Sequence, residues 1–421
     1  MGTKGSFILT VLLIACFCVV SNYWSSAMPS AHPIKKTGAV DSGSYTNLFA
    51  DLMGKSEIQV NAKVDDAFRQ LFCGDEGEQR VYYPVGSDMA YIEDVLNQDI
   101  RTEGMSYGMM IAVQLDKKTE FDRLWKWAKT RMQHQSGPRR GYFAWHCRKD
   151  GTIIDANSAS DGEEWIVTAL FFASARWGNG EGLYNYRAEA QAILDAMLGK
   201  EAEPENDGTI KNMFNRNEEQ VVFVPFGRGA EFTDPSYHLP HYYELWARWA
   251  DKENSFWSAA ASTSRRFLKE TVHPVTGLAP DYAHFDGRPV NPWNSGSGNF
   301  RYDAWRVAMN VAVDYVWFSR DDWAVSQSNR LLRFFHSQGM GTYSNLFTLD
   351  GKKLTEVHSP GLVAMNAVAC LAATDSIRNK FVEEFWNAPI PSGPYRYYDG
   401  LLAMLALLQV SGRFRVYNPA P

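Results

Sequence analysis

The chain has 421 residues, of which 45% are hydrophobic and 21% are charged, and its formal net charge is −6. This composition is typical of a globular protein with a large core, and a negative chain without a basic stripe is not expected to bind nucleic acid non-specifically. Aromatic residues are abundant, with 14 Trp, 20 Tyr and 24 Phe; such side chains fill cores and also pack on flat apolar faces, including those of sugar rings. No linker-like stretch divides the chain after about residue 44, which predicts a single domain over residues 44–421.

Residues 1–27 are typical of an export signal. The apolar run over residues 7–20 is too short for a comfortable membrane-spanning helix and fits the core of a signal peptide. Residues 13–16 resemble a bacterial lipobox, which would leave Cys16 lipidated, whereas cleavage near residue 27 would release a soluble protein. Residues 28–43 are expected to form a flexible tether. The prediction is an exported protein, either periplasmic or held in the outer membrane through Cys16.

Three cysteines lie beyond the export segment, namely Cys73, Cys147 and Cys370. Their wide spacing gives no CxxC pair and no Cys/His cluster of the kind that binds zinc. At most one disulfide could form among them, and buried free thiols are the expectation.

From residue 44 onward the hydrophobic pattern is mostly helical. It predicts twelve helices, over residues 56–72, 102–115, 119–133, 161–177, 183–198, 235–251, 254–272, 302–318, 321–337, 360–372, 375–387 and 398–411. Helices that are apolar all round alternate with helices that carry more charge, as expected if buried helices are covered by amphipathic ones. Six such pairs predict an all-α, double-layered helical barrel whose longer loops gather at one end.

One β excursion is expected in this helical chain. Residues 142–147 and 152–154 flank Asp150-Gly151, a dipeptide that favours a tight hairpin turn. The hairpin comes just before the helix predicted at 161–177, so Trp145 could lie at the end of the barrel where the loops gather.

Three carboxylates occupy equivalent places in this pattern. Glu103, Asp161 and Asp303 each stand at the start of an apolar helix that follows a long loop. In a closed barrel these helix starts would converge on one cleft. Carboxylates around an aromatic cleft suit hydrolysis of a glycosidic bond, in which one donates a proton to the leaving oxygen and another activates water or attacks the sugar.

The alternative is that these residues only cap helices. Asp is favoured at N-caps, Thr102 is a plausible cap, and Ser160/Glu163 and Asp161/Glu164 both have capping-box spacing. Glu103 is a poorer cap. It also raises a difficulty, because a helix N-terminus lowers the pKa of a carboxyl group whereas a general acid needs it raised. Burial, or repulsion from a neighbour such as Asp161, would have to raise the pKa of Glu103.

Histidines offer weaker signals. His238 and His241 lie close together in sequence, but nothing nearby completes a metal site, and no metal or cofactor is predicted. His358 lies in a loop just before the apolar helix at 360–372, where it could be a hydrogen-bonded loop residue or a ligand contact.

The stretch Thr102-Glu103-Gly104-Met105-Ser106-Tyr107-Gly108-Met109 resembles the signature of glycoside hydrolase family 8. Residues 141–145, 160–165 and 301–306 resemble the same family in the same order, and the likeness covers about residues 50–411. The resemblance implies an (α/α)6 barrel and an inverting mechanism, with Glu103 as general acid and Asp303 as general base. It also implies that Asp161 binds and distorts the sugar and that Trp145 is an aromatic platform at that subsite. Further candidates for substrate contact are Tyr107, Tyr237, Tyr302 and Arg306.

Residues 234–240 and 358–361 are similar to the members that release xylose from the reducing end of xylo-oligosaccharides. In those enzymes a His-bearing loop closes the cleft, and His358 is the matching residue. The expected substrate is therefore a β-1,4-xylo-oligosaccharide, acted on by a monomer. The alternatives are an endo-xylanase, endo-glucanase or chitosanase of the same family, a non-catalytic glycan-binding surface lipoprotein, and an epimerase or lyase on the same barrel.

Overall fold

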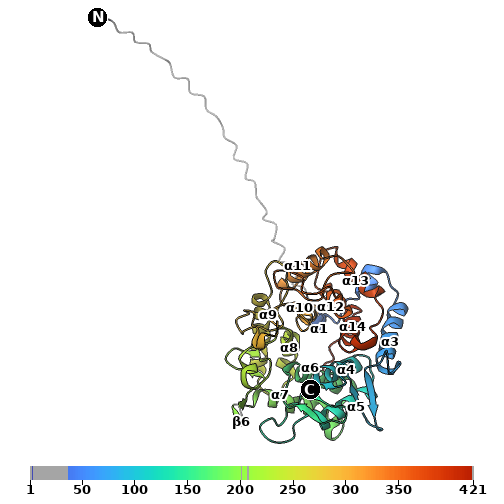
Figure 1. Ribbon diagram of the computed structural model, residues 1–421, viewed down its shortest axis with the longest axis vertical. Coiled ribbons are helices and arrows are strands. Elements are labelled where there is room, and N and C mark those ends of the chain that lie inside the picture. Colours follow the sequence, from blue (N-terminus) through green and yellow to red (C-terminus); the bar gives the residue numbers. More distant parts are fainter. Residues whose placement is uncertain (1, 3–36, 201, 206–207, 420–421) are drawn as a thin grey trace, which may run out of the picture. The chain divides into compact units, whose positions relative to one another are not determined.

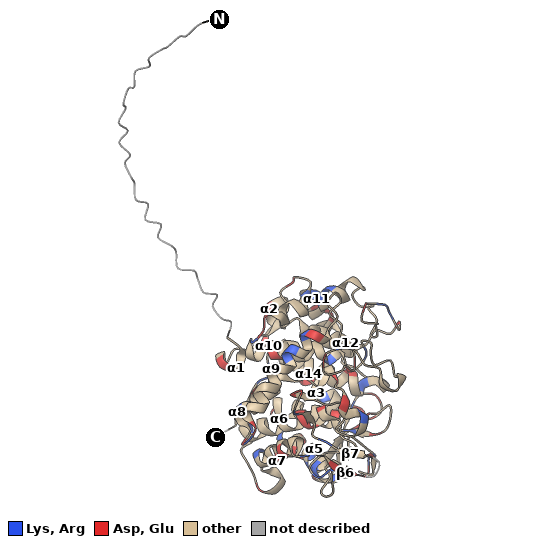
Figure 2. Ribbon diagram, turned by 90° about the vertical axis from the view of Figure 1, so that its left-hand side faces the viewer, with Lys and Arg blue, Asp and Glu red and all other residues tan. Residues whose placement is uncertain are grey.

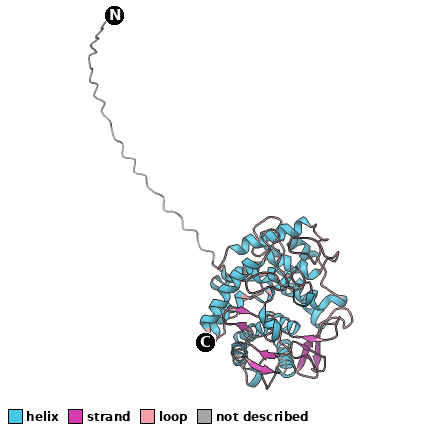
Figure 3. Cartoon of the chain, turned by 60° about the vertical axis from the view of Figure 1, so that its left-hand side comes forward, coloured by secondary structure: helices cyan, strands magenta, loops and turns pink. Residues whose placement is uncertain are grey.

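Helices dominate the computed structural model (Figures 1 and 3), which describes residues 2, 37–200, 202–205 and 208–419. Within this part of the chain, twelve α-helices have ten or more residues. They are α3 (Glu57–Cys73), α4 (Thr102–Gln114), α5 (Lys118–Trp127), α6 (Ser160–Trp177), α7 (Tyr186–Leu198), α8 (Pro240–Trp249), α9 (Asn254–Thr271), α10 (Trp305–Phe318), α11 (Trp323–Ser337), α12 (Pro360–Ala369), α13 (Arg378–Asn387) and α14 (Arg396–Val410).

The helices form two concentric layers. Each inner helix packs against one outer helix, in the pairs α4 with α5, α6 with α7, α8 with α9, α10 with α11, α12 with α13, and α14 with α3. The inner ring closes because α14 also packs against α4. Between α6 and α8 the contact includes a hydrogen bond from Trp246 Nε1 to Thr168 Oγ1 at 3.1 Å. The predicted (α/α)6 barrel is therefore confirmed.

Apolar sequence decides which helix lies inside. In α4 every residue from Gly104 to Gln114 is buried, and in α12 so is every residue from Gly361 to Ala369. Outer helices such as α11 bury one side only, as expected for an amphipathic helix over a buried one. All twelve predicted helices are present. The one over 235–251 is shorter, because a 3₁₀ turn (Pro235–Tyr237) comes first and α8 begins at Pro240, a residue suited to the first helical position.

Short strands form four small antiparallel sheets, all between residues 82 and 221 in the described part of the chain. The predicted hairpin is present but shorter, with β4 (His146–Cys147) paired to β5 (Ile153–Asp155), and β3 (Ile100–Arg101) adds a third strand. The sequence did not predict the other three sheets. They pair β1 (Tyr82–Val85) with β2 (Met89–Ile92), β6 (Glu203–Glu205) with β7 (Gly208–Ile210), and β8 (Phe214–Asn215) with β9 (Gln220–Val221).

The folded unit begins at Thr37. Residues 37–43, which the sequence assigned to a tether, belong to this unit instead, because the short helix α1 (Ala39–Ser42) packs against α10 and a second short helix, α2 (Leu48–Met53), packs against α13. The predicted export signal lies outside the described residues. Within the described part, no helix is both long and apolar enough to span a membrane.

Cys73, Cys147 and Cys370 are all free thiols. Cys147 and Cys370 are buried, as expected, whereas Cys73 is exposed, which the sequence did not predict. Acidic and basic residues are interspersed over the visible helices (Figure 2), in keeping with the absence of a basic stripe in the sequence.

Candidate active site

The three carboxylates converge at the end of the barrel where the inner helices begin. Glu103 and Asp161 lie in the first turns of α4 and α6, and Asp303 lies in the turn that leads into α10. The N-cap residues of these helices are Arg101, Ala159 and Ala304, and none makes a side-chain capping hydrogen bond. The capping interpretation, including Thr102 and the two capping boxes, is therefore wrong.

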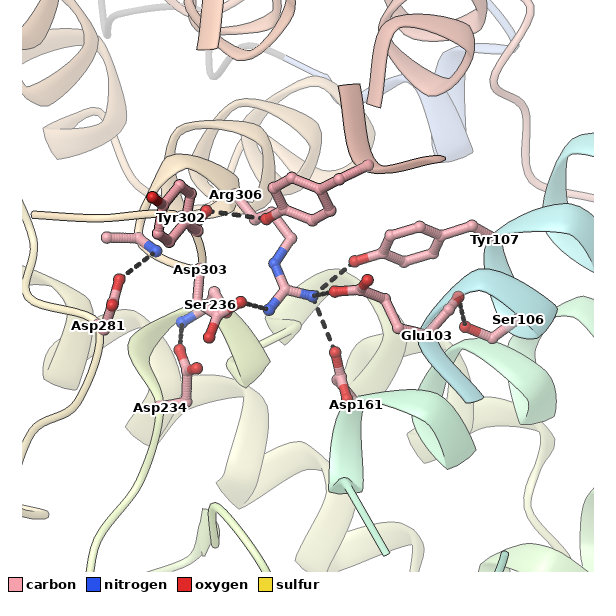
Figure 4. Close-up of polar contacts among 12 residues, drawn as sticks. Glu103, Ser106, Tyr107, Asp161, Asp234, Ser236, Asp281, Tyr302, Asp303 and Arg306 are labelled. Atoms are coloured by element: carbon pink, nitrogen blue, oxygen red, sulfur yellow. Dashed lines mark hydrogen bonds and ion pairs between the residues drawn. The ribbon is translucent and has the colours of Figure 1, made fainter. Parts of the chain in front are cut away.

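Arg306, from the first turn of α10, lies between the carboxylates (Figure 4). Its Nη2 donates to Asp303 Oδ1 at 2.8 Å. Its Nη1 is 2.8 Å from Asp161 Oδ2 and 3.3 Å from Glu103 Oε2, and it also donates to the Tyr107 hydroxyl at 2.6 Å. Because Nη1 carries only two hydrogens, these three contacts compete, and Glu103 has the longest and weakest of them.

Glu103 thus has the raised pKa that a general acid needs. Burial raises it most, Arg306 opposes this, and the charges of Asp161 and Asp303 raise it further, so that the pKa of Glu103 reaches about 7. Both causes that the sequence suggested, burial and a neighbouring charge, are confirmed. The side chain of Asp303 is the most open of the three carboxylates, with 28% of its surface exposed against 4% for Asp161, so water can reach it.

The three-stranded sheet places Trp145 beside Glu103. Strand β3 leads directly into α4, and the Thr102 amide donates to the Trp145 carbonyl at 3.0 Å. The Trp145 ring is half-buried and stacks on His146, with the ring centroids 4.6 Å apart. The hairpin therefore brings an aromatic platform to the first turn of α4.

A close approach of helices is built into the same turn. A Cβ atom on Gly104 would lie 2.5 Å from Tyr397 Cε2, and one on Gly162 would lie 2.6 Å from the Thr102 side chain. Glycine at position 104 lets Tyr397, from α14, reach Glu103, and the Tyr397 hydroxyl lies 3.1 Å from Glu103 Oε1. The sequence did not identify Tyr397, because it comes from the last helix and no pattern links it to α4.

Two pockets adjoin these residues. The first, which we call the carboxylate pocket, has a volume of about 330 Å³ and is lined by Glu103, Asp161 and Asp303 together with Trp145, Tyr237 and Tyr282. The second, the tyrosine pocket, has a volume of about 340 Å³, and its lining includes Tyr302, Trp305, His358, Tyr395, Tyr397 and Tyr398. The pockets are neighbours at two points, where Tyr397 contacts Glu103 and where Tyr302 precedes Asp303.

Two further acids stand beside Asp303 (Figure 4). Asp281 Oδ1 accepts from the Ala304 amide at 3.1 Å, and Asp234 Oδ1 accepts from the Ser236 amide at 2.7 Å. Burial raises the pKa of both well above its usual range, and the charge of Asp303 adds to this. The sequence assigned a role to neither residue, although Asp234 begins the stretch 234–240 that carries part of the family resemblance, since both lie in loops without a periodic pattern.

The residues predicted to bind substrate have different surroundings. Trp145, Asp161, Tyr237 and Arg306 line the carboxylate pocket, whereas Tyr302 and His358 line the tyrosine pocket. Tyr107 is fully buried and holds Arg306 instead, so its predicted substrate contact is corrected to a supporting role.

The His pair is not a metal site. His238 is buried between the hydroxyls of Thr233 and Ser264, and burial lowers the pKa of His238 and of His241 to about 3. No group of three potential ligand side chains within the described ranges is arranged to hold a metal ion.

The family model of the glycosyl hydrolases family 8 matches residues 67–412. The chain belongs to glycoside hydrolase family 8. The resemblance carried by residues 102–109 is thereby confirmed, and the (α/α)6 barrel agrees with this family.

Its relatives include xylan-processing proteins. The chain is 46% identical to the reducing-end xylose-releasing exo-oligoxylanase Rex8A of Paenibacillus barcinonensis, over 90% of this chain and 98% of that protein. It is 43% identical to a reducing end xylose-releasing exo-oligoxylanase of Halalkalibacterium halodurans, over 92% of this chain and 98% of that one. A crystal structure of a family 8 xylanase from Teredinibacter turnerae, a catalytic mutant in complex with xylohexaose, is 48% identical with a TM-score of 0.88, covering 91% of this chain and all of that chain.

Proposed function

We propose that this family 8 hydrolase releases xylose from the reducing end of β-1,4-xylo-oligosaccharides with inversion of configuration. The observation that carries the proposal is the placement of a protonatable Glu103 and an open Asp303 on either side of Arg306, next to two pockets. Similarity to the exo-oligoxylanases, at 43% and 46% identity over nearly the whole chain, supports the substrate.

Glu103 would act as the general acid. With its pKa raised to about 7, about half of Glu103 still carries its proton at neutral pH and more does so below it. Glu103 also stands beside Tyr397, which lines the tyrosine pocket. When Glu103 gives its proton to the glycosidic oxygen, it becomes an anion. Arg306 and the Tyr397 hydroxyl can then donate to its two oxygens, which stabilises the charge that develops during bond cleavage.

Asp303 would act as the general base. One of its oxygens is held by Arg306, and its partly exposed carboxyl can take a proton from a water on the opposite face of the sugar. Inversion requires the acid and base carboxyls to lie roughly 6.5–9.5 Å apart, leaving room for that water. Glu103 and Asp303 contact different nitrogens of the Arg306 guanidinium, so the guanidinium separates the two carboxyl groups.

The tyrosine pocket would hold the leaving xylose, with His358 facing its reducing end. An exo-acting enzyme needs such a boundary, whereas an endo-acting enzyme needs a groove that continues. The test is digestion of xylotriose and of its reduced, xylitol-ended form. Rapid release of xylose from xylotriose with rejection of the reduced substrate is expected. Equal cleavage of both would contradict the reducing-end assignment.

A second candidate is endo-xylanase activity, favoured by the Teredinibacter turnerae xylanase that accommodates xylohexaose and is 48% identical to this chain. Product analysis on soluble xylan separates the two candidates, because an endo-acting enzyme would produce mixed oligomers and a reducing-end enzyme would produce xylose. A non-catalytic glycan-binding protein would keep Trp145 but would need neither Glu103 nor Asp303.

Export of the chain is part of the proposal. The apolar run over residues 7–20 and the lipobox-like residues 13–16 support it, and they favour attachment of a lipid at Cys16. Labelling with radioactive palmitate in a bacterial host tests this, with Cys16→Ser as the control. A labelled wild type and an unlabelled variant are expected. An exported but unlabelled wild type would instead indicate a soluble periplasmic enzyme.

A further inference from the structure

The long loop between α11 and α12 is held by one side chain from another helix. Glu384, in α13, accepts from the Gly341 amide at 2.8 Å through Oε1 and from the Tyr343 hydroxyl at 3.1 Å through Oε2. Oε1 also lies 3.5 Å from His358 Nε2. A single carboxylate with 15% of its side chain exposed therefore contacts both ends of the loop that carries His358.

The backbone decides which nitrogen of His358 is available to a ligand. Nδ1 lies 2.8 Å from the Tyr343 carbonyl, and a carbonyl oxygen can only accept, so Nδ1 carries a hydrogen. The imidazole is packed edge-on against the Tyr343 ring, with the ring centroids 4.5 Å apart. Nε2 is then the variable position, an acceptor in the neutral ring and an N–H donor in the charged ring.

We propose that Glu384 is a positioning residue that keeps His358 doubly protonated. Because Glu384 Oε1 lies 3.5 Å from Nε2, longer than a normal hydrogen bond, the Nε2–H can also donate to a reducing-end hydroxyl bound in the tyrosine pocket that His358 lines. Glu384 does not line the tyrosine pocket, whereas His358 does. It would act on specificity through His358 and not by touching the sugar. This inference rests on the proposed function, because it assigns the tyrosine pocket to the leaving xylose.

The electrostatics agree with this geometry. Burial lowers the pKa of His358, but the contacts with Glu384 and with the Tyr343 carbonyl outweigh burial, and the pKa is raised above its usual value. On the same loop, Lys353 and Glu356 pair with each other at 2.6 Å and are exposed. The other titratable groups that line the pocket are Asp94, Asp399, Tyr302, Tyr395, Tyr397 and Tyr398. Glu384 is the carboxylate in contact with the imidazole.

The test is Glu384→Gln, which keeps an oxygen to accept from Gly341 but loses the charge. The measured quantity is the ratio of kcat/KM on xylotriose to kcat/KM on reduced xylotriose, followed across pH. A charged hydrogen bond contributes roughly 1.5–3 kcal/mol, so the ratio is expected to fall about tenfold to a hundredfold. Because Glu103 affects both substrates equally, its own titration cancels in the ratio.

The proposal also predicts how discrimination between the two substrates changes with pH. In the wild type, discrimination should be lost as pH rises through the raised pKa of His358. Removing the Glu384 charge lowers that pKa, so the variant should lose discrimination at a lower pH. The matched control is Glu383→Gln, an exposed neighbour on α13, which should change neither the ratio nor its pH profile.

Two outcomes separate the inference from the proposed function. If the wild type does not discriminate between the substrates, the reducing-end function itself fails. If the wild type discriminates and folded Glu384→Gln keeps the same ratio and pH profile, the role of Glu384 is refuted. If Glu384→Gln lowers the melting temperature, the same substitution is tested in the His358→Asn variant, and the ratio is measured again. There, adding Glu384→Gln should leave the ratio unchanged, because the two residues act as a unit, and a further drop would refute the inference.

Discussion

Replacing Asp161 by Asn should move the alkaline limb of the pH–activity profile to lower pH. Asp161 and Glu103 share Arg306 Nη1, at 2.8 and 3.3 Å, and the charge of Asp161 is one of the factors that raise the pKa of Glu103 to about 7. The Asn side chain has nearly the same shape and can still accept from Arg306, so the substitution removes mainly the charge.

The size of the shift follows from the spacing. Two charges about 5 Å apart interact by roughly 3 kcal/mol at an effective dielectric constant of about 20, equivalent to about two pKa units. Arg306 lies between the two carboxyls and reduces this repulsion, so we expect a shift of about one unit. Activity requires protonated Glu103 and is lost as pH rises through the pKa of Glu103. A lower pKa therefore moves the alkaline limb of the profile to lower pH.

The assay is kcat/KM on xylotriose from pH 4 to 9, normalised to each variant's maximum because Asp161 lines the pocket and its loss will also lower the rate. Asp155→Asn is the matched control, since it removes a charge from the same pocket and Asp155 is not among the groups that set the pKa of Glu103. A limb that stays in place or moves to higher pH in Asp161→Asn would refute the account of how Glu103 keeps its proton.

Three further predictions concern the same end of the barrel. Glu103→Gln and Asp303→Asn should each lower kcat by at least roughly 10²- to 10⁴-fold with an unchanged circular dichroism spectrum; near-normal turnover of either would contradict the assignment. Gly104→Ala should lower the free energy of unfolding by about 1–3 kcal/mol and reduce kcat, since its Cβ would displace Tyr397; a melting temperature equal to the wild type's would be inconsistent with this packing. Burial raises the pKa of Glu163 to about 8, so the folded state binds a proton that the unfolded state has already lost. The free energy of unfolding should therefore fall as pH rises from about 4 to about 8, by up to about 1.4 kcal/mol per pH unit. Glu163→Gln should flatten the dependence of Tm on pH, and an unchanged slope would show that Glu163 does not cause it.

The sequence predicted much of the fold and the convergence of the three carboxylates at the candidate site. The alternation of apolar and amphipathic helices was enough to predict two layers, because burial of apolar surface decides which helix lies inside. The recurrence of Glu103, Asp161 and Asp303 at helix starts predicted the cleft, since equivalent helix ends meet in a closed barrel. Their role as caps could not be excluded from sequence, because caps and catalytic acids use the same residue types at the same positions.

Contacts between distant segments were not predictable from the same patterns. Tyr397 lies 294 positions from Glu103, and only ring closure by α14 brings them together. Asp234 and Asp281 come from irregular loops. Tyr107 was predicted to contact substrate, because nothing in the sequence indicates that its hydroxyl accepts from Arg306. Short strands such as β6 and β7 are too brief for a period-two pattern to stand out.

The configuration of the first product tests the central claim most directly. Proton NMR during hydrolysis of a xylo-oligosaccharide follows the anomeric signal of the newly formed reducing end before mutarotation. If Glu103 is a general acid and Asp303 a general base that activates water on the opposite face, the β-linkage should yield the α-anomer first. Initial appearance of the β-anomer would mean retention, and it would contradict the roles of Glu103 as acid and Asp303 as base.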